Sequence, residues 1–399
     1  MTDSLPVVAG FRFAGIAAGI KKQPGAKDLG LIVADRPVPT AGVFTRNLVR
    51  AAPVEISVSR VRAGKAQALL VNSGNANACT GKEGHAAAIE SSRAVAEALS
   101  LDESLVLPSS TGVIGVVLPK EKVVSAVPAL VADLSADGAD RFAEAIMTTD
   151  RFRKTATANV RVGRREGVLL GIAKGAGMIH PNMATTLGFL VTDVAIKPAY
   201  LRRALRAAVE KTLNRISVDG DTSTNDSFYL MASGALGNAP LGGGDAASKR
   251  FEAALEEVLE SLGRSMVADG EGAEHAVRIE VLAAKESDAL KVARTIAHSL
   301  LVKTALHGCD PNWGRIIAAA GRAGVKFDPA KAEVFIGAVR VFKKGLPTFD
   351  AETEKKASEV MKQPHYTIRV SLGTGKAVGH VLTSDLGHEY VRINADYRS

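Results

Sequence analysis

The chain has 399 residues, of which 46% are hydrophobic and 23% charged, a composition typical of globular proteins rather than disordered or fibrous ones. This length exceeds what one compact core usually holds, so we expect two lobes or one large multilayer sandwich. The net charge of +8 is modest and is not gathered into a long basic run, which disfavours nucleic-acid binding.

Cysteine content and the N-terminal region point to the cytoplasm. Cys79 and Cys309 stand far apart in sequence, so neither a disulfide framework nor a cysteine-built metal site is expected. Residues 1–22 carry an acidic residue, Asp3, near their start and an arginine within their apolar stretch, unlike a signal peptide. No apolar run approaches the length of a membrane span. We therefore expect a soluble cytoplasmic protein with neither a membrane nor a nucleic-acid partner.

Strand-length apolar runs and helical periodicity share the chain. In chain order the patterns predict a strand over 66–76, a helix over 84–100, a strand with a polar turn and a second apolar stretch over 105–118, helices over 120–134 and 138–146, strands over 167–173 and 187–194, a helix over 197–212, a loop over 236–250, a helix over 250–264, a strand over 277–283, a helix over 286–306, and strands over 333–337, 366–372 and 378–383. This mixture predicts sheets covered by helices.

One glycine-rich stretch, "GTGKAVG" (373–379), is similar to part of a phosphate-binding loop. It lacks the Ser or Thr after the lysine and the spacing of that motif, and it lies between two predicted strands. We interpret it as a hairpin turn.

Several polar stretches of small residues interrupt the apolar strands, and turn chemistry explains any one of them. Their number and their position at strand ends are typical of backbone exposed beside a cavity. They are "NSGNANACTG" (72–81), "SSTGVIG" (109–115), "KGAGMIHPNMATT" (174–186), "DGDTSTND" (219–226), "DGEGAEH" (269–275), "HGCDPNWGR" (307–315) and "YVRINADYRS" (390–399).

Metal and triad chemistry receive little support from these stretches. The eight histidines are scattered without ligand spacing, and "DGDTSTND" has too few well-placed carboxylates for a calcium loop. We interpret it as a polar turn whose Asp and Thr side chains bond to backbone, and we expect no metal and no cofactor. A Ser-His-Asp triad stays open because triads assemble in space, although no nucleophile-elbow pattern is present.

Threonine offers a third chemistry. Thr185 and Thr186 lie between a glycine-rich loop and a predicted strand. An internal threonine is a weak nucleophile, but cleavage of the preceding peptide bond would free an α-amino group with a pKa of about 8. That amine can act as the general base for its own hydroxyl, which makes Ala184–Thr185 a candidate self-cleavage site.

The stretch "KGAGMIHPNMAT" closely resembles the self-cleavage site of the ornithine acetyltransferase (glutamate N-acetyltransferase) family of arginine biosynthesis. Blocks in the same order along nearly the whole chain resemble that family as well: "GFRFAGIAAGIKK", "VNSGNANACTG", "SSTGVIG", "IMTTD", "VDGDTSTND", "DGEGA", "HGCDPNWGR" and "YVRINADYRS".

The resemblance implies an αββα sandwich, two facing sheets covered by helices. It implies self-cleavage into an α chain of residues 1–184 and a β chain of residues 185–399, which stay together and pair into an α2β2 heterotetramer. It implies ping-pong transfer of acetyl from N2-acetyl-L-ornithine to L-glutamate through an acetyl-threonine enzyme. Some members also take acetyl from acetyl-CoA, as amino-acid N-acetyltransferases.

By the same resemblance, Thr185 is the nucleophile, and Thr111 and Gly112 form the oxyanion hole. The substrate-binding positions that match are Thr148, Lys174, Thr185, Glu271, Asn394 and Ser399. Lys174 suits a carboxylate and Glu271 an ammonium group.

Two departures from the family pattern are Thr186, where Met is usual, and Arg151, where another Thr is common. Both bear on substrate preference and local packing. The alternative function is a self-processed amidohydrolase or aminopeptidase of related fold, which would use water as the acceptor. A further alternative, a structural or regulatory protein without activity, predicts an uncut chain of 41.6 kDa.

Overall fold

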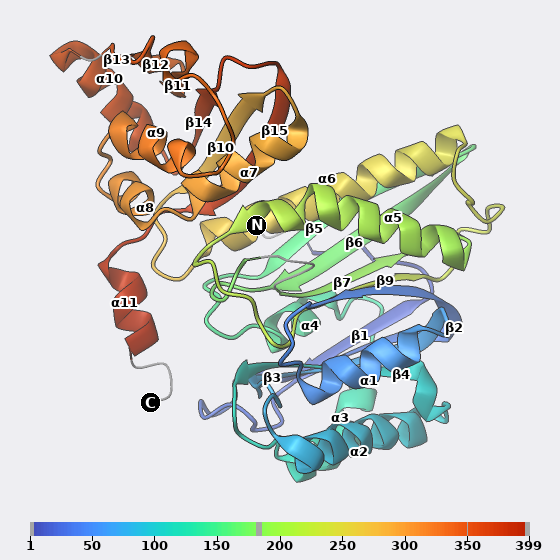
Figure 1. Ribbon diagram of the computed structural model, residues 1–399. Helices are drawn as coiled ribbons and strands as arrows, with labels where there is room; N and C mark the ends of the chain where they lie inside the picture. The colour runs from blue at the N-terminus through green and yellow to red at the C-terminus, as the bar shows by residue number, and fades with distance from the viewer. Residues whose placement is uncertain (1–3, 181–185, 349, 396–399) are drawn as a thin grey trace. The chain divides into compact units, whose positions relative to one another are not determined.

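The computed structural model describes residues 4–180, 186–348 and 350–395 (Figure 1). The chain forms two compact units. The first consists of residues 1–175, 181–214 and 222–263, and the second of residues 176–180, 215–221 and 264–399. Both units are therefore built from segments on either side of the Ala184–Thr185 bond.

The first unit is built on strands in the order β4-β3-β2-β9-β7-β6-β5, with β1 beside β2. The 16-residue strand β2 pairs with β1 and β3 along its first part and with β9 along its second, so it belongs to two sheets. The strands are β1 (Phe11–Ile16), β2 (Leu29–Phe44), β3 (Lys65–Asn75), β4 (Val106–Val113), β5 (Lys154–Val162), β6 (Arg165–Lys174), β7 (Leu187–Thr192) and β9 (Ser227–Ala232). The helices are α1 (Ala52–Val61), α2 (Gly81–Leu99), α3 (Lys120–Ala132), α4 (Ala139–Ala145), α5 (Pro198–Lys211) and α6 (Ala246–Ala268), the last continuing into the second unit.

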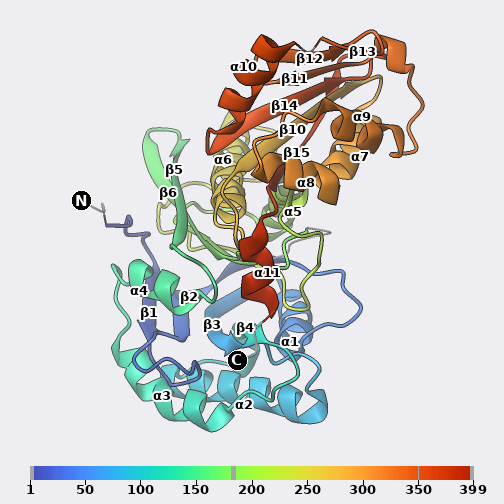
Figure 2. The ribbon, with the colours of Figure 1, turned by 90° about the vertical axis from the view of Figure 1, so that its left-hand side faces the viewer.

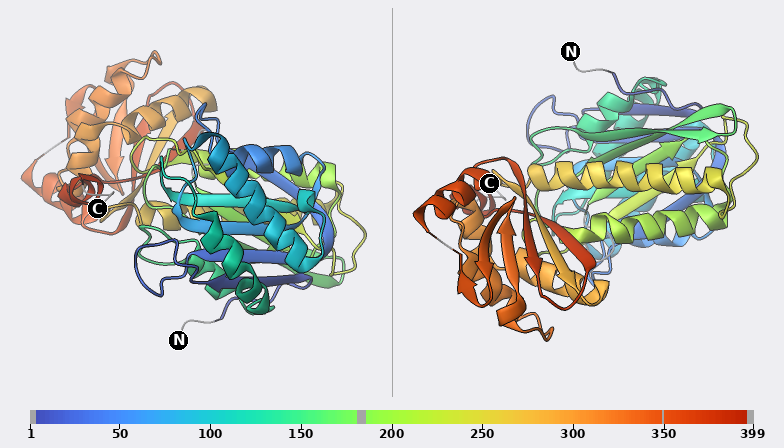
Figure 3. Two further views of the ribbon diagram at one scale, coloured as in Figure 1. Left: turned by 90° about the horizontal axis from the view of Figure 1, so that it is seen from below. Right: turned by 90° about the horizontal axis from the view of Figure 1, so that it is seen from above.

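Side-chain alternation along these strands creates two apolar faces per sheet. One core lies between the sheets, where Phe142, Phe189 and Tyr229 pack ring against ring. A second core lies between the outer face of the β1–β4 sheet and helices α2 and α3. Helices α5 and α6 cover the opposite outer face, and Gly171 on β6 leaves room for α6 (Figure 3). The first unit is thus the αββα sandwich that the resemblance implies.

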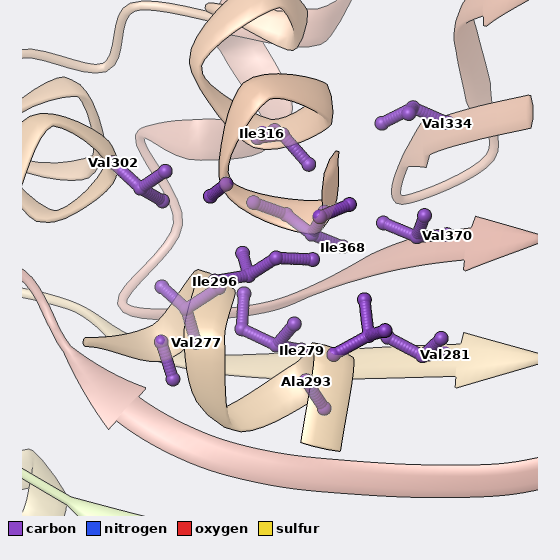
Figure 4. Packing of buried hydrophobic residues seen from close by; sticks show 14 of the residues in the cluster. Val277, Ile279, Val281, Ala293, Ile296, Val302, Ile316, Val334, Ile368 and Val370 are labelled. Atoms are coloured by element: carbon purple, nitrogen blue, oxygen red, sulfur yellow. The ribbon is translucent and has the colours of Figure 1, made fainter. Parts of the chain in front are cut away.

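The second unit has its own sheet, in the order β13-β12-β11-β14-β10-β15-β8 (Figure 2). Its strands are β8 (Ile216–Ser217), β10 (Ala276–Ala283), β11 (Glu333–Ile336), β12 (Val339–Lys343), β13 (Leu346–Pro347), β14 (His365–Ser371) and β15 (Ala377–Ser384). Its helices are α7 (Glu286–Ala297), α8 (Leu300–His307), α9 (Trp313–Gly321), α10 (Ala351–Met361) and α11 (His388–Ala395). Valine, isoleucine and alanine side chains from β10, β14, α7 and α9 meet in one apolar core (Figure 4).

Most of the predicted elements are confirmed, although α6 begins at Ala246, inside the loop predicted over 236–250. Two further predictions are wrong. The helix expected over 286–306 is two helices, because the Ser299 side chain accepts a hydrogen bond from the Val302 N–H and starts α8 afresh. Residues 373–379 are not a hairpin turn, since β14 and β15 do not pair with each other but flank β10 on either side.

Other elements were missing from the prediction. The polar stretches 307–315 and 390–399 overlap two helices, since α9 begins at Trp313 and α11 ends at Ala395. The prediction also lacks strands β1, β2, β5, β8, β9, β12 and β13 and helices α1 and α10. Within the described part of the chain, no helix is both long enough and apolar enough to traverse a membrane.

Candidate functional site

Thr111 and Gly112, the residues proposed for the oxyanion hole, lie at a β-bulge between β3 and β4. The register shifts at Gly74–Asn75, where Asn75 pairs with both Thr111 and Val113. Gly112 has a φ of +135°, and a Cβ there would lie 2.3 Å from the carbonyl carbon of Gly74. Only glycine fits so close an approach of two backbones.

The Lys174 side chain ties the end of β6 to this bulge. Its Nζ donates to Thr111 Oγ1 at 3.1 Å, and both residues are buried. An ammonium group has no acceptor, so Thr111 Oγ1 must be the acceptor of this bond. The hydroxyl proton of Thr111 is then directed elsewhere, as a donor to an oxyanion requires.

Asp150 holds the surrounding backbone in place. Its Oδ1 accepts from Lys154 Nζ at 2.6 Å and from the Gly175 N–H at 2.7 Å, and its Oδ2 accepts from the Thr148 N–H at 2.8 Å. Burial alone would raise the pKa of Asp150, but the charges of Lys174 and Lys154 and these hydrogen bonds outweigh it and hold the pKa well below its usual range. Asp150 is therefore a permanent carboxylate that fixes Thr148 and the residue after Lys174.

Asn225 and Asp226 bring a second polar stretch to the same region of the first unit. The Asn225 side chain donates to the backbone oxygens of Ala76 (2.6 Å), the residue after β3, and of Ser110 (2.8 Å) on β4. Asp226 is fully buried, and its Oδ2 has no hydrogen-bond partner. Burial raises the pKa of Asp226 well above its ordinary value, although Ser223 and Lys174 act in the opposite direction. Its carboxyl is therefore protonated well above the pH at which an exposed aspartate ionises.

The raised pKa of Asp226 predicts a pH-dependent cost to stability. As the pH rises from the unfolded-state value of about 3.9, the unfolded chain releases this proton while the folded chain retains it, so stability falls until the folded pKa is passed. Asp226→Asn cannot ionise. We expect the variant to match the wild type near pH 4 and to exceed it by about 1–3 kcal/mol at pH 8, the range for an uncompensated buried polar group.

Thermal unfolding at several pH values measures this difference. Asp35→Asn, at an exposed position on β2, is the control and should show no such widening with pH. A constant difference between Asp226→Asn and the wild type across this range would contradict the assignment.

Two further predicted substrate residues meet in the second unit. Asn394 Nδ2 donates to Glu271 Oε2 at 2.9 Å and to the Tyr390 backbone oxygen at 3.0 Å. The Glu271 carboxylate lies against Gly177, where an added Cβ would be 2.5 Å from Oε2. Gly177 thus leaves the space that this carboxylate occupies.

Gly177→Ala is expected to displace the Glu271 carboxylate and to weaken its bond with Asn394. If Glu271 holds the ammonium group of an amino-acid substrate, KM should rise roughly tenfold with little change in kcat. Steady-state kinetics measure this split. Gly321→Ala is the matched control, because no atom lies within 4 Å of a Cβ at that position. A Gly177→Ala enzyme with unchanged KM would remove Glu271 from substrate binding.

The predicted site residues therefore fall into two groups, each within one unit. Thr111, Gly112, Thr148 and Lys174 share the first, and Glu271 and Asn394 the second. Ala184, Thr185 and Ser399 lie outside the described residues. Thr186 is described and buried, with its backbone oxygen accepting from Ser227.

Sequence reasoning did not assign Asp150, Lys154, Asn225 or Asp226. Asp226 stands in the polar stretch 219–226, and Asp150 ends the block "IMTTD" that resembles the family, so membership of these blocks is the available signal. Their burial and their partners depend on the packing of distant segments.

The family model described as "ArgJ family" matches residues 12–399. The chain belongs to the ArgJ family. Its relatives named "Arginine biosynthesis bifunctional protein ArgJ" include that of Geobacter sulfurreducens, 47% identical over 396 residues, which cover 98% of this chain and 100% of the relative. The ArgJ of Chlorobaculum tepidum is 47% identical over 394 residues, covering 98% and 96% of the two chains.

A solved ArgJ structure is similar to this chain as well. The crystal structure of ArgJ from Bacillus halodurans matches with a TM-score of 0.50 and 40% sequence identity. The match covers 97% of the solved chain but only 52% of the present one. The solved ArgJ chain is thus about half as long as this one.

Proposed function

We propose that this chain is a glutamate N-acetyltransferase that carries acetyl from N2-acetyl-L-ornithine to L-glutamate in arginine biosynthesis. Membership of the ArgJ family over nearly the whole chain is the observation that carries the proposal. The Thr111–Gly112 bulge supports it, because acyl transfer needs hydrogen-bond donors for a tetrahedral oxyanion.

The proposed reaction has two half-reactions. The Thr185 hydroxyl attacks the acetyl carbonyl, its proton passing to the Thr185 α-amine, and collapse of the intermediate releases ornithine with that proton. The glutamate amine then attacks the acetyl ester, the ester C–O bond breaks, and the proton lost by the amine passes to Thr185 Oγ and regenerates the hydroxyl. In both, the Thr111 hydroxyl and the Gly112 N–H stabilise the oxyanion, with the Lys174 charge nearby.

The charges of two side chains indicate which substrate groups they bind. Lys174 is proposed to attract a substrate carboxylate, and Glu271, oriented by Asn394, to bind an ammonium group. Thr148, whose backbone is fixed by Asp150, completes this set together with Ser399. No bound cofactor is required, because the acetyl group is held by the enzyme itself.

We also propose cleavage of the chain at Ala184–Thr185 into fragments 1–184 and 185–399. The half-length solved chain of the Bacillus halodurans relative supports this. Strand β6 would belong to the first fragment and strand β7 to the second. The two strands nevertheless pair with each other, from Lys174–Leu187 to Leu169–Thr192. Strands β2 and β9 also pair across the two fragments.

Those pairings predict that the cut fragments remain together. The sheet of strands β2, β9, β7, β6 and β5 would contain strands of both fragments, and both units would contain residues of each, so separation would require unfolding of the cores. The fragments should co-elute from a size-exclusion column at about twice the mass of one chain, as an α2β2 assembly, and separate only in denaturant. Elution of either fragment alone under native conditions would contradict this.

The decisive assay for the function supplies substrates in turn. Acetylornithine with glutamate should yield acetylglutamate and ornithine in equal amounts, with parallel double-reciprocal lines typical of a ping-pong reaction. Ornithine release that does not depend on glutamate would indicate the hydrolase alternative. The relatives are named bifunctional, so we propose acetyl-CoA as a second acetyl donor. An assay in which acetyl-CoA replaces acetylornithine tests this activity.

We place this activity in the cytoplasm. Both cysteines are free, and Cys79 is exposed, which suits a reducing compartment. Fractionation of cells that express the tagged protein tests the location.

A further inference from the structure

The loop between β2 and α1 presents two apolar side chains to solvent. Leu48 is 100% exposed and Val49 is 50% exposed. Arg46 and Arg50 stand on either side of this pair, and both are exposed. Neither arginine forms an ion pair with a residue that the structure describes. The tip of the loop therefore combines an apolar surface with two guanidinium groups that are available to an anion.

Hydrogen bonds fix the backbone of this loop. The Asn47 side chain donates to the Thr222 oxygen at 3.3 Å, and its Oδ1 accepts from the Val49 N–H at 2.9 Å. Thr45 Oγ1 donates to the Ser223 oxygen at 2.8 Å. These bonds hold the loop in one conformation, in which its apolar side chains lose contact with water only when another molecule covers them.

The loop lies beside the Thr111–Gly112 bulge. Ala51, the residue directly after the loop, is fully buried in an apolar cluster that includes Ala76, and Ile114 packs against that cluster. Ala76 follows β3 and Ile114 follows β4, the two strands that form the bulge. The loop and the proposed oxyanion hole therefore belong to one region of the first unit.

A second pair of exposed apolar side chains follows the bulge. Val116 and Val117 are 48% and 41% exposed. Their backbone oxygens accept from the side chain of Asn75, a bulge residue, at 3.0 and 3.3 Å. Exposed apolar side chains thus occur on two segments next to the bulge, and such surfaces mark interaction sites.

The charge of the loop selects among the molecules that could cover it. A second copy of the chain carries a net charge of +8, which is not complementary to two arginines. Acetylornithine and glutamate have little apolar surface. Acetyl-CoA has both features, because its pantetheine arm is largely apolar and its phosphates are anions that a guanidinium binds through paired hydrogen bonds.

We propose that residues 46–50 bind the phosphate-bearing part of acetyl-CoA, with the acyl-carrying arm extending along the exposed apolar side chains to the bulge. The proposal rests on the proposed use of acetyl-CoA as a second acetyl donor. Acetylornithine has neither a phosphate nor such an arm, so the loop serves only one of the two donors.

The transfer step itself uses the same nucleophile as with acetylornithine. Thr185 Oγ forms a bond to the thioester carbonyl carbon, the C–S bond breaks, and the hydroxyl proton passes to the sulfur, which leaves as the thiol of CoA. The acetyl ester then reacts with glutamate as before. The loop contributes binding of the donor and takes no part in the exchange of bonds.

Arg46→Gln combined with Arg50→Gln tests the proposal, because it removes two exposed charges without altering the bonds that fix the loop. Transfer to glutamate is measured with acetyl-CoA, with acetylornithine and with S-acetylpantetheine, which has the same thioester and arm but no phosphate. We expect kcat/KM for acetyl-CoA to fall at least about tenfold, since charge-assisted contacts to phosphate are lost. The values for the other two donors should stay nearly unchanged.

Arg161→Gln combined with Arg164→Gln is the matched control. Both arginines are exposed near the β5–β6 turn, and β5 lies at the opposite edge of the sheet from β4. This variant loses the same charge as the loop variant and should keep the wild-type kcat/KM for acetyl-CoA. An equal loss in the control would reduce the effect to general charge attraction and overturn the proposal.

The other outcomes separate the proposal from its neighbours. An unchanged kcat/KM for acetyl-CoA in the loop variant, or an equal loss with S-acetylpantetheine or acetylornithine, would contradict phosphate binding by the loop. A smaller assembly of the loop variant on a size-exclusion column would instead make the loop a contact between copies. A wild-type enzyme that uses acetylornithine but never acetyl-CoA would refute the second donor and this proposal, and leave transfer from acetylornithine standing.

Discussion

Thr185→Ala is expected to leave the chain as a single band of 41.6 kDa with no acetyl-transfer activity. One hydroxyl is proposed to attack the Ala184 carbonyl first and the acetyl group of the substrate in every later turnover. Its removal therefore abolishes both steps, and alanine supplies no other nucleophile. Denaturing gels, N-terminal sequencing of the second fragment and the acetylornithine assay measure the two effects.

Two controls make this prediction specific to one hydroxyl. Thr185→Ser keeps the hydroxyl and should retain some cleavage. Thr186→Met should be cut and keep most of its activity, since Thr186 is a buried packing residue and a larger side chain typically costs about 1–3 kcal/mol of stability. An active Thr185→Ala enzyme, or a second fragment that begins at Thr186, would show that the nucleophile is wrongly assigned.

Thr111→Ala is expected to lower kcat by about a hundredfold or more while the fold and KM change little. The loss of one oxyanion donor typically costs about 3 kcal/mol in the transition state and leaves ground-state binding nearly intact. The structure gives the reason to expect a donor here, because Lys174 Nζ donates to Thr111 Oγ1 at 3.1 Å and so directs the hydroxyl proton elsewhere.

Thr111→Ser restores a hydroxyl at the same position and should recover most of kcat. Unfolding midpoints of both variants should stay within a few degrees of the wild type, since the bulge is held by Gly112, Asn75 and the Asn225 side chain. A Thr111→Ala enzyme with unchanged kcat and a raised KM would make Thr111 a substrate contact instead.

The sequence by itself determined the class of fold and the family. Period-two and period-3.6 apolar patterns are local, so strands such as β3 and β10 and helices such as α2 and α5 were predictable from their own residues. The ordered motif blocks identified the family and named Thr111, Lys174 and Glu271. Each of these inferences depends on residues that are neighbours along the chain.

The tertiary structure determined how segments far apart in sequence pair and which neighbours surround each buried side chain. The sharing of β2 between two sheets, and the placement of β10 between β14 and β15, arise from pairing between strands far apart in sequence, which no local period encodes. The pKa directions of Asp150 and Asp226 likewise differ between two buried aspartates. Two lysines and backbone donors lower the pKa of Asp150, whereas burial raises the pKa of Asp226, one of whose oxygens has no hydrogen-bond partner. The residue type is the same, so the packed neighbours decide the direction of each shift.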